Sequence, residues 1–392
     1  MAPAPTASTS KILRLILISS LTLVSACGGR ALTKIEGGDA VLPKELEDQF
    51  AVRSAEALVP SAGAVGIVGG AASAEAMPAT QIEALKAAKG KKKKKGKGKK
   101  GTPEAEALEA AVSDSGELKY PNRRPLVDPI YQGEELTYDI TYFGVSAGEV
   151  VLKQQPPKVI NNRRVYHFKA DIQSSKVFAL FYKLNDTVES YWDYEGLFSH
   201  RYHLVLDEKA QTRDALELYD SVKGQTFYWN RWNHETKGYI ETKEFKPMTR
   251  FPQDAMSLLY YVRTLPLEEG KVFSIPTVAE GKVWEVRTTV LRKERKSMPL
   301  GKRDCFVLKP EIFMEGKPQN KGEVYLWVTD DENRYPVQLE AKVRIGTIHM
   351  SLSHVVPGTK PDGTTPVSMN AAAPTPVPDI SETPTPLPSL RK

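Results

Sequence analysis

The stretch RFPQDAMSLLYYVRTL, Arg250–Leu265, carries the clearest helical pattern in a region that otherwise alternates like strands. Asp254 brings a carboxylate to the N-terminal end, where it can cap free N–H groups, and Pro266 ends the helix. One short helix among many strands is expected to plug or cover the concave face of a curved sheet. Its apolar residues recur at helical spacing and form one face, made of Ala255, Leu258, Leu259 and Val262.

Strand patterns flank this helix on both sides, over residues 134–355. Apolar and polar residues alternate most regularly in Val337–Ile345, and the same alternation runs through Leu136–Tyr142. Turn signals such as Asn161-Asn162 separate the strands. About a dozen strands with short turns predict a mainly β fold: an antiparallel curved sheet or open β-barrel with one short central helix.

Residues 1–26 have the pattern of an export signal. Lys11 and Arg14 precede an apolar run that is too short and too interrupted to span a membrane as an ordinary helix. The run ends in Val24-Ser25-Ala26-Cys27, which resembles the lipobox of bacterial lipoproteins. The alternative is an ordinary secretory signal with a cysteine there by chance.

The resemblance to lipoproteins implies that Cys27 is acylated and becomes the first residue of the mature chain. Its acyl chains would then anchor the protein firmly, since each buried methylene adds about 0.8 kcal/mol of membrane affinity. Gly28 and Gly29 follow in place of an aspartate, which by the same resemblance favours the outer membrane over the inner one. The protein is therefore expected at the outer membrane, on its periplasmic face or on the cell surface.

Residues 27–120 are predicted to form a disordered tether rich in Ala, Gly and Lys, which as a coil would reach about 50 Å. Lys91–Lys100 holds eight lysines, and without them the net charge falls from +6 to −2. The globular part is therefore not basic, and a nucleic-acid partner is not expected. The lysine run could be a solvated spacer, or it could lie on an anionic envelope surface or on acidic polymers of the cell wall. Residues 357–392 form a second disordered segment, rich in Pro and Thr.

The segment 121–356 resembles the bacterial domain family DUF3108. Gly133–Asp139 opens the similarity, and Gln253–Arg263 and Leu326–Val337 follow in the order and spacing of that family. The resemblance implies an exported, β-rich protein of the cell envelope. It implies no established reaction, so it defines the class of protein and not its chemistry.

The sequence shows no convincing catalytic constellation, and we expect no catalytic residue, metal site or cofactor. His200 and His203 are three residues apart in a strand, which sends their side chains to opposite faces. Cys305 is expected to be a small buried hydrophobe, and its acidic neighbour works against a nucleophilic thiolate. Asp330–Asn333 is interpreted as a turn, with a calcium site as the alternative.

Aromatic and apolar residues give the remaining binding signal. Trp192 and Tyr194 lie on one expected strand and Trp229 and Trp232 on another, where outward rings could stack sugars or touch acyl chains. The alternative is cross-strand ring pairing that only stabilises the sheet. The apolar helix face at Leu258, Leu259 and Val262 completes the set of possible ligand contacts.

These observations predict a lipid-anchored, non-enzymatic envelope protein that binds or carries a lipid, glycolipid or glycan. Its expected partners are the membrane, through acyl chains on Cys27, that ligand, and other envelope proteins. A structural adaptor in an envelope-spanning secretion, motility or polysaccharide-export assembly is the alternative. An enzyme that acts on envelope polymers is a third and weaker possibility.

Overall fold

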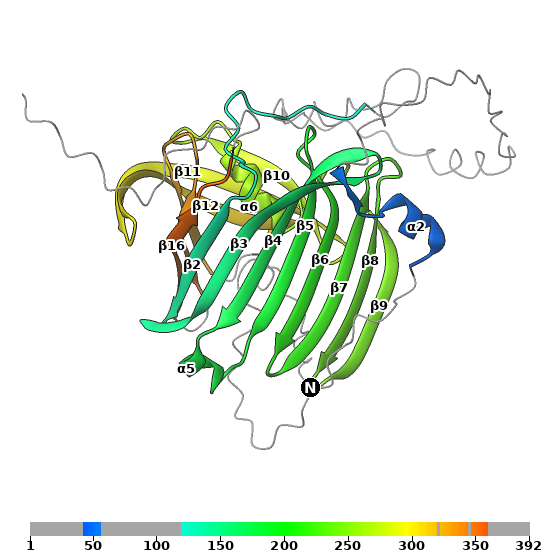
Figure 1. Ribbon diagram of the computed structural model, residues 1–392, viewed down its shortest axis with the longest axis horizontal. Helices are drawn as coiled ribbons and strands as arrows, with labels where there is room; N and C mark the ends of the chain where they lie inside the picture. Colours follow the sequence, from blue (N-terminus) through cyan, green and yellow to red (C-terminus); the bar gives the residue numbers. More distant parts are fainter. Residues whose placement is uncertain (1–41, 56–118, 320–321, 344–345, 360–392) are drawn as a thin grey trace, which may run out of the picture. The chain divides into compact units, whose positions relative to one another are not determined.

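The computed structural model describes residues 42–55, 119–319, 322–343 and 346–359 (Figure 1). Apart from residues 119–121, they belong to one compact unit that comprises Met1–Ala55 and Asn122–Lys392. The expected export signal, Cys27, the lysine run and nearly all of the C-terminal segment lie outside the described residues. Within the described part, no helix combines the length and the apolar character needed to cross a membrane.

One antiparallel sheet contains the described strands, and fourteen of them follow the path β10-β11-β12-β14-β15-β16-β2-β3-β4-β5-β6-β7-β8-β9. The strands on this path are β2 Glu135–Tyr142, β3 Val145–Ile160, β4 Arg163–Ser174, β5 Asn185–Asp193, β6 Ser199–Glu208, β7 Gln211–Asp220, β8 Gln225–His234, β9 Gly238–Pro247, β10 Val272–Ala279, β11 Lys282–Met298, β12 Gly301–Met314, β14 Val324–Thr329, β15 Pro336–Lys342 and β16 Thr347–Val356. Two short strands pair beside it, β1 (Arg53–Ser54) with β3 and β13 (Lys317–Pro318) with β12. The path begins at β10 and ends at β9, so the sheet is curved but open, and the predicted fold class is confirmed.

Alternation in the sequence becomes alternation of burial in the sheet. In β2 every second residue is buried, and Leu136 and Tyr138 lie opposite Leu152 and Val150 of β3. The hairpin from β3 to β4 turns at Asn161-Asn162, where both residues have positive φ, as a two-residue hairpin requires. The register therefore follows from local pattern and turn chemistry.

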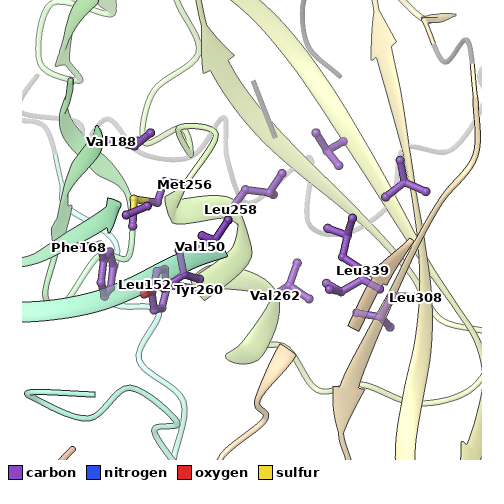
Figure 2. Packing of buried hydrophobic residues seen from close by; sticks show 14 of the residues in the cluster. Val150, Leu152, Phe168, Val188, Met256, Leu258, Tyr260, Val262, Leu308 and Leu339 are labelled. Carbon is purple, nitrogen blue, oxygen red and sulfur yellow. The ribbon is translucent and has the colours of Figure 1, made fainter. Parts of the chain in front are cut away.

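The central helix, α6, covers Ser257–Arg263 and is shorter than the predicted Arg250–Leu265, because bends, a β-bridge from Gln253 to Thr277 and a turn precede it, and Thr264 and Leu265 leave the helix at its end. Figure 2 shows its apolar side chains inside the curve of the sheet. The ring of Tyr260 stacks on Phe168 of β4 at 3.6 Å between centroids. Side chains on both sides enclose α6, among them Val150, Leu152 and Val188 from one part of the sheet and Leu308 and Leu339 from another. The helix is thus a core plug.

Residues 42–55, here called the strap, correct the prediction that residues 27–120 are uniformly disordered. They form α2 (Lys44–Gln49) and β1, which pairs with β3. Leu46 and Phe50 are four residues apart and bury their side chains against the outer face of the sheet. They contact an apolar cluster there, made of Ile160, Val165, Tyr191, Leu216, Leu218, Phe227 and Trp229. A six-residue helix is unstable alone, so this outer cluster is what stabilises it.

Candidate functional site

The interior of the sheet has two chemically different ends. At one end β2, β4 and β6 begin and β3 and β5 finish; we call it the locked end, because buried hydrogen bonds and ion pairs close it. At the opposite end lie the turn from β2 to β3 and the connection from β4 to β5, which contains α5 (Lys176–Ala179) (Figure 1). An apolar pocket lies there, and we call this the pocket end.

Gln253 ties three parts of the chain together at the locked end. Its side-chain oxygen accepts from Trp192 Nε1 at 2.8 Å, and its amide donates to the carbonyl of Leu197 at 2.7 Å. Its backbone carbonyl accepts from the N–H of Val278 in β10, at 2.8 Å. One buried glutamine thus fixes β5, the turn into β6 and the edge strand β10 in front of α6.

Asp254 anchors the start of α6. One carboxylate oxygen accepts from the hydroxyls of Ser190 and Ser199, each at 2.6 Å. The other accepts from the backbone N–H groups of Met256 and Ser257, at 2.8 and 2.7 Å. Burial raises the pKa of Asp254, and these four donors counteract that rise without cancelling it. The arrangement is a buried helix cap, in which the serines donate to a structural carboxylate.

Buried charges at the locked end are matched by opposite charges. Arg263 is fully buried, and its guanidinium donates to both carboxylate oxygens of Glu134, at 2.5 and 2.8 Å. Asp193 accepts from Arg163 Nε at 2.5 Å and lies 2.9 Å from His200 Nε2. Burial opposes ionisation of Asp193, but the hydrogen bonds from Arg163 and His200 lower its pKa well below the ordinary range. Each of these ion pairs compensates charges that would be costly to bury alone.

The pocket end holds the candidate binding site, which we call the end pocket. Its volume is about 40 Å³, room for about three water-sized groups. Gly148 forms part of its wall, and a side chain there would lie 2.2 Å from the carbonyl oxygen of Gln173, so only glycine lets β3 and β4 approach this closely. The remaining wall is mostly apolar. Its apolar part comes from Ile140, Tyr142, Ala147, Ile172, Phe178, Leu184 and Ile348, and Gln173, Ser174 and Tyr182 complete it.

Exposed apolar side chains lie beside the pocket-lining residues in the chain. Ser175 caps α5 by accepting from the N–H of Phe178, and its own N–H donates to the carbonyl of Ala147, which holds α5 beside β3. The chain neighbours of the pocket-lining residues then point into solvent. Fifteen large apolar side chains are exposed in the described part, and five of them belong to the β2–β3 hairpin or to the segment that contains α5. We call these five the rim: Phe143, Val145, Val177, Leu180 and Phe181.

A pair of buried carboxyl groups lies next to the end pocket. Tyr182, which lines the pocket, donates to Glu208 at 2.6 Å. Asp186 lies opposite Ile172, another lining residue. Burial and the neighbouring Glu208 raise the pKa of Asp186 to about 8. The pocket end therefore buries two like groups together, where the locked end pairs opposite charges.

The aromatic residues expected to bind a ligand do not form one platform. Trp192 is fully buried on the inner face, and Tyr194 lies under the guanidinium groups of Arg124 and Arg164. Trp229 is on the outer face, in the cluster under the strap. Trp232 points to the inner face and donates to Gln211 Oε1 at 2.8 Å. Trp192 is on β5 and the other two tryptophans are on β8, so two strands separate them.

The helix residues Leu258, Leu259 and Val262 belong to or pack against the main core, and none of them lines the end pocket. The residues that do form the pocket end were missed in the sequence. A signal was nevertheless present in Val177–Tyr182, VFALFY, an apolar run between Lys176 and Lys183 that belongs to no expected strand. An apolar run without a strand partner is a candidate for an interaction segment.

Two further expectations have clear structural outcomes. Cys305 is fully buried, and burial followed by nearby acidic groups raises its pKa to about 12, as expected for a structural thiol. Asp331 accepts from Thr329 and from the N–H groups of Asn333 and Arg334, which makes this acidic segment a turn. In the described ranges, no group of three His, Cys, Asp or Glu side chains is placed to hold a metal ion.

The fold and its motifs agree with a sequence family. The model of the family described as "Protein of unknown function (DUF3108)" matches residues 137–353, more than half of the chain. The protein therefore belongs to the DUF3108 family. No curated protein matches the sequence.

Three solved structures are similar in part. A β-barrel-like DUF1849 protein of Brucella abortus is 9% identical with a TM-score of 0.37, over 58% of this chain and 98% of that one. A candidate exported protein of Bacteroides fragilis with a YmcC-like fold is 11% identical with a TM-score of 0.26, over 59% and 98%. A candidate lipoprotein of Parabacteroides distasonis is 10% identical with a TM-score of 0.25, over 61% and 100%. At these TM-scores the similarity carries no argument about function.

Proposed function

We propose that this protein is an exported, lipid-anchored and non-enzymatic protein of the outer membrane, whose β domain binds the acyl chain of a lipid or glycolipid in the end pocket. The observation that supports this function is the apolar lining of that pocket at the end of the sheet. A volume of about 40 Å³ suits the tip of an acyl chain and not a whole lipid, so the rest of the ligand would lie outside. The lipobox-like sequence before Cys27 supports the anchor.

The strap changes how far such an anchor would let the domain move. Only fourteen residues separate Cys27 from Leu42, where the strap begins. As a coil they span about 20 Å, and fully extended about 50 Å. The lysine run lies in the chain between Ala55 and Asn122, both of which belong to the same unit, so it adds nothing to the reach. The domain would therefore stay close to the membrane.

A pocket-filling substitution tests the binding function. The chain from residue 28 onward keeps every described residue and can be titrated with cis-parinaric acid, a fluorescent fatty acid. We expect saturable binding that Ala147→Leu weakens at least tenfold, because Ala147 lines the pocket. Ala179→Leu in α5 is the matched control, since Ala179 is not part of the lining. Absence of binding, or equal binding by both variants, would contradict the proposal.

The adaptor function rested mainly on a long tether, and it can still be tested directly. Pull-down from cross-linked envelopes should recover the protein without a constant set of protein partners, if it acts as a lipid-binding protein. A reproducible set of partners would instead favour the adaptor. Lipid extracted from the purified protein and identified by mass spectrometry gives the complementary measurement.

A further inference from the structure

We propose that the rim docks onto the surface of a lipid bilayer and places the mouth of the end pocket at the membrane. This inference goes beyond ligand binding, because docking needs the rim and does not need an occupied pocket. It starts from the geometry of the two rim segments. They are adjacent, since Ser175 N–H donates to Ala147 O at 2.9 Å and Ser175 Oγ donates to Ser146 O at 2.9 Å.

The rim is apolar where a free surface is normally polar. Leu180 and Phe181 are 78% and 72% exposed, and Phe143 is 63% exposed on the neighbouring turn. Their main chains are held by α5 and by the β2–β3 hairpin, so the side chains project from ordered backbone. Exposed Phe, Leu and Val at the tips of connections are the residues that enter the interfacial layer of a membrane. The interfacial layer of a lipid bilayer therefore matches the chemistry of the exposed rim side chains.

Lysines lie on both sides of the rim, as they do in protein segments that bind at a membrane interface. Lys176 and Lys183 bracket the apolar run, and Lys209 donates to the carbonyl of Phe181 at 3.0 Å. The nearby Asp207 is paired with Lys183 at 3.1 Å. Ammonium groups beside inserted apolar side chains meet lipid phosphates, and anionic lipids strengthen the contact. The charge pattern thus complements a lipid surface.

A membrane fits the rim better than a protein partner does. A stable protein interface uses about 20–30 residues on each side, and the rim offers five large side chains. The anchor geometry is also consistent with the bilayer. Strands such as β7, with ten residues, are about 33 Å long. Cys27 can lie up to about 50 Å from the strap, so it can reach a membrane at the pocket end.

Vesicle binding tests this docking surface without an acyl anchor. The chain from residue 28 onward is sedimented with vesicles of phosphatidylethanolamine and phosphatidylglycerol. The eight lysines of the lysine run would attract such vesicles by charge, so the rim is measured at high salt, where screening removes that contribution. We expect Leu180→Ser with Phe181→Ser to weaken partitioning at least tenfold. Leu126→Ser with Val222→Ser removes two exposed side chains outside the rim and should change partitioning less than twofold.

A local probe gives a second readout. Cys305 is fully buried, so Leu180→Cys labelled with an environment-sensitive dye reports on the rim alone. The dye should shift to the blue when vesicles are added, and the same dye at Val222→Cys should not shift. Docking is overturned if the parent chain fails to sediment at high salt, if the rim variant sediments like the parent, or if both dyes respond alike. A dimer that the rim substitutions dissociate would also overturn it, since a second copy would then cover the rim. Failure of fatty-acid binding with intact vesicle binding would affect only the proposed function.

Discussion

At the locked end Arg263 is buried against a carboxylate, whereas at the pocket end Asp186 is buried against a second carboxyl group. The locked end pairs the buried carboxylates of Glu134 and Asp193 with the guanidinium groups of Arg263 and Arg163. The pocket end leaves the five rim side chains in solvent and keeps two like groups together. The same strands form both ends, so the stability of the fold alone does not require the exposed rim and the carboxyl pair of the pocket end. Regions that sacrifice stability in this way are where function is expected.

The largest effect should come from breaking the pair at the locked end. Arg263→Ala leaves Glu134 buried without its guanidinium and also removes hydrogen bonds to the carbonyls of Pro129 and Asn333. We expect the free energy of unfolding to fall by about 3–5 kcal/mol. Urea denaturation followed by tryptophan fluorescence measures it. A loss below about 1 kcal/mol would show that this end is not held by charge pairing.

A smaller loss is expected where two strands approach at the pocket wall. Gly148→Ala places a methyl group 2.2 Å from the carbonyl oxygen of Gln173, so β3 and β4 must separate. This should cost about 2–3 kcal/mol of unfolding free energy. Gly144→Ala is the matched control, because Gly144 has open space around it and only its φ of +74° is unfavourable. Its cost should be about 1 kcal/mol. Equal losses would mean that the close approach is not important.

The carboxyl pair at the pocket end predicts a dependence on pH. Folding raises the pKa of Asp186 from 3.8 to about 8, so between these values the folded chain holds a proton that the unfolded chain has released. The stability that this proton provides is fully present below pH 3.8 and is lost as pH rises through about 8. Asp186→Asn has no such group, so it should become more stable relative to wild type by about 4 kcal/mol between pH 5 and pH 9, because each pH unit up to the folded pKa adds about 1.4 kcal/mol.

Thermal unfolding of both proteins across this pH range provides the measurement. Asp139→Asn, at an exposed position on β2, is the control and should follow wild type at every pH. If wild type and Asp186→Asn keep a constant difference from pH 5 to pH 9, then Asp186 does not titrate in the folded protein over that range.

The sequence predicted the sheet because its information is local. Period-two alternation in β2 and the Asn161-Asn162 turn specify strand and hairpin without reference to distant residues. The helix was also placed correctly, but its start was wrong. Asp254 does cap it, yet it does so from a turn whose position depends on Ser190 and Ser199, more than fifty residues away. Long-range contacts of this kind leave no periodic signal.

The pocket end could be predicted less well for the same physical reason. The sheet places Trp229 and Trp232 on opposite faces, which their three-residue spacing within one strand already implies. Leu46 and Phe50 sit in a stretch whose composition is that of a tether, and they fold only because the outer face of the sheet offers apolar contacts. The decisive partners of Leu46 and Phe50 come from strands far away in the chain. The apolar run Val177–Tyr182 was a usable local signal, because it fits neither strand nor tether.

The smallest effect on stability is expected at the rim, and it tests the difference between the locked end and the pocket end most directly. Leu180→Ser with Phe181→Ser removes two side chains that are exposed in the folded protein, so the free energy of unfolding should change by less than about 0.5 kcal/mol. The same urea titration that measures Arg263→Ala measures this pair. Large loss at the locked end, with almost none at the rim, would show that the rim side chains are not retained for the fold. A loss above about 2 kcal/mol would instead make the rim a part of the core, and its exposure would no longer point to a partner.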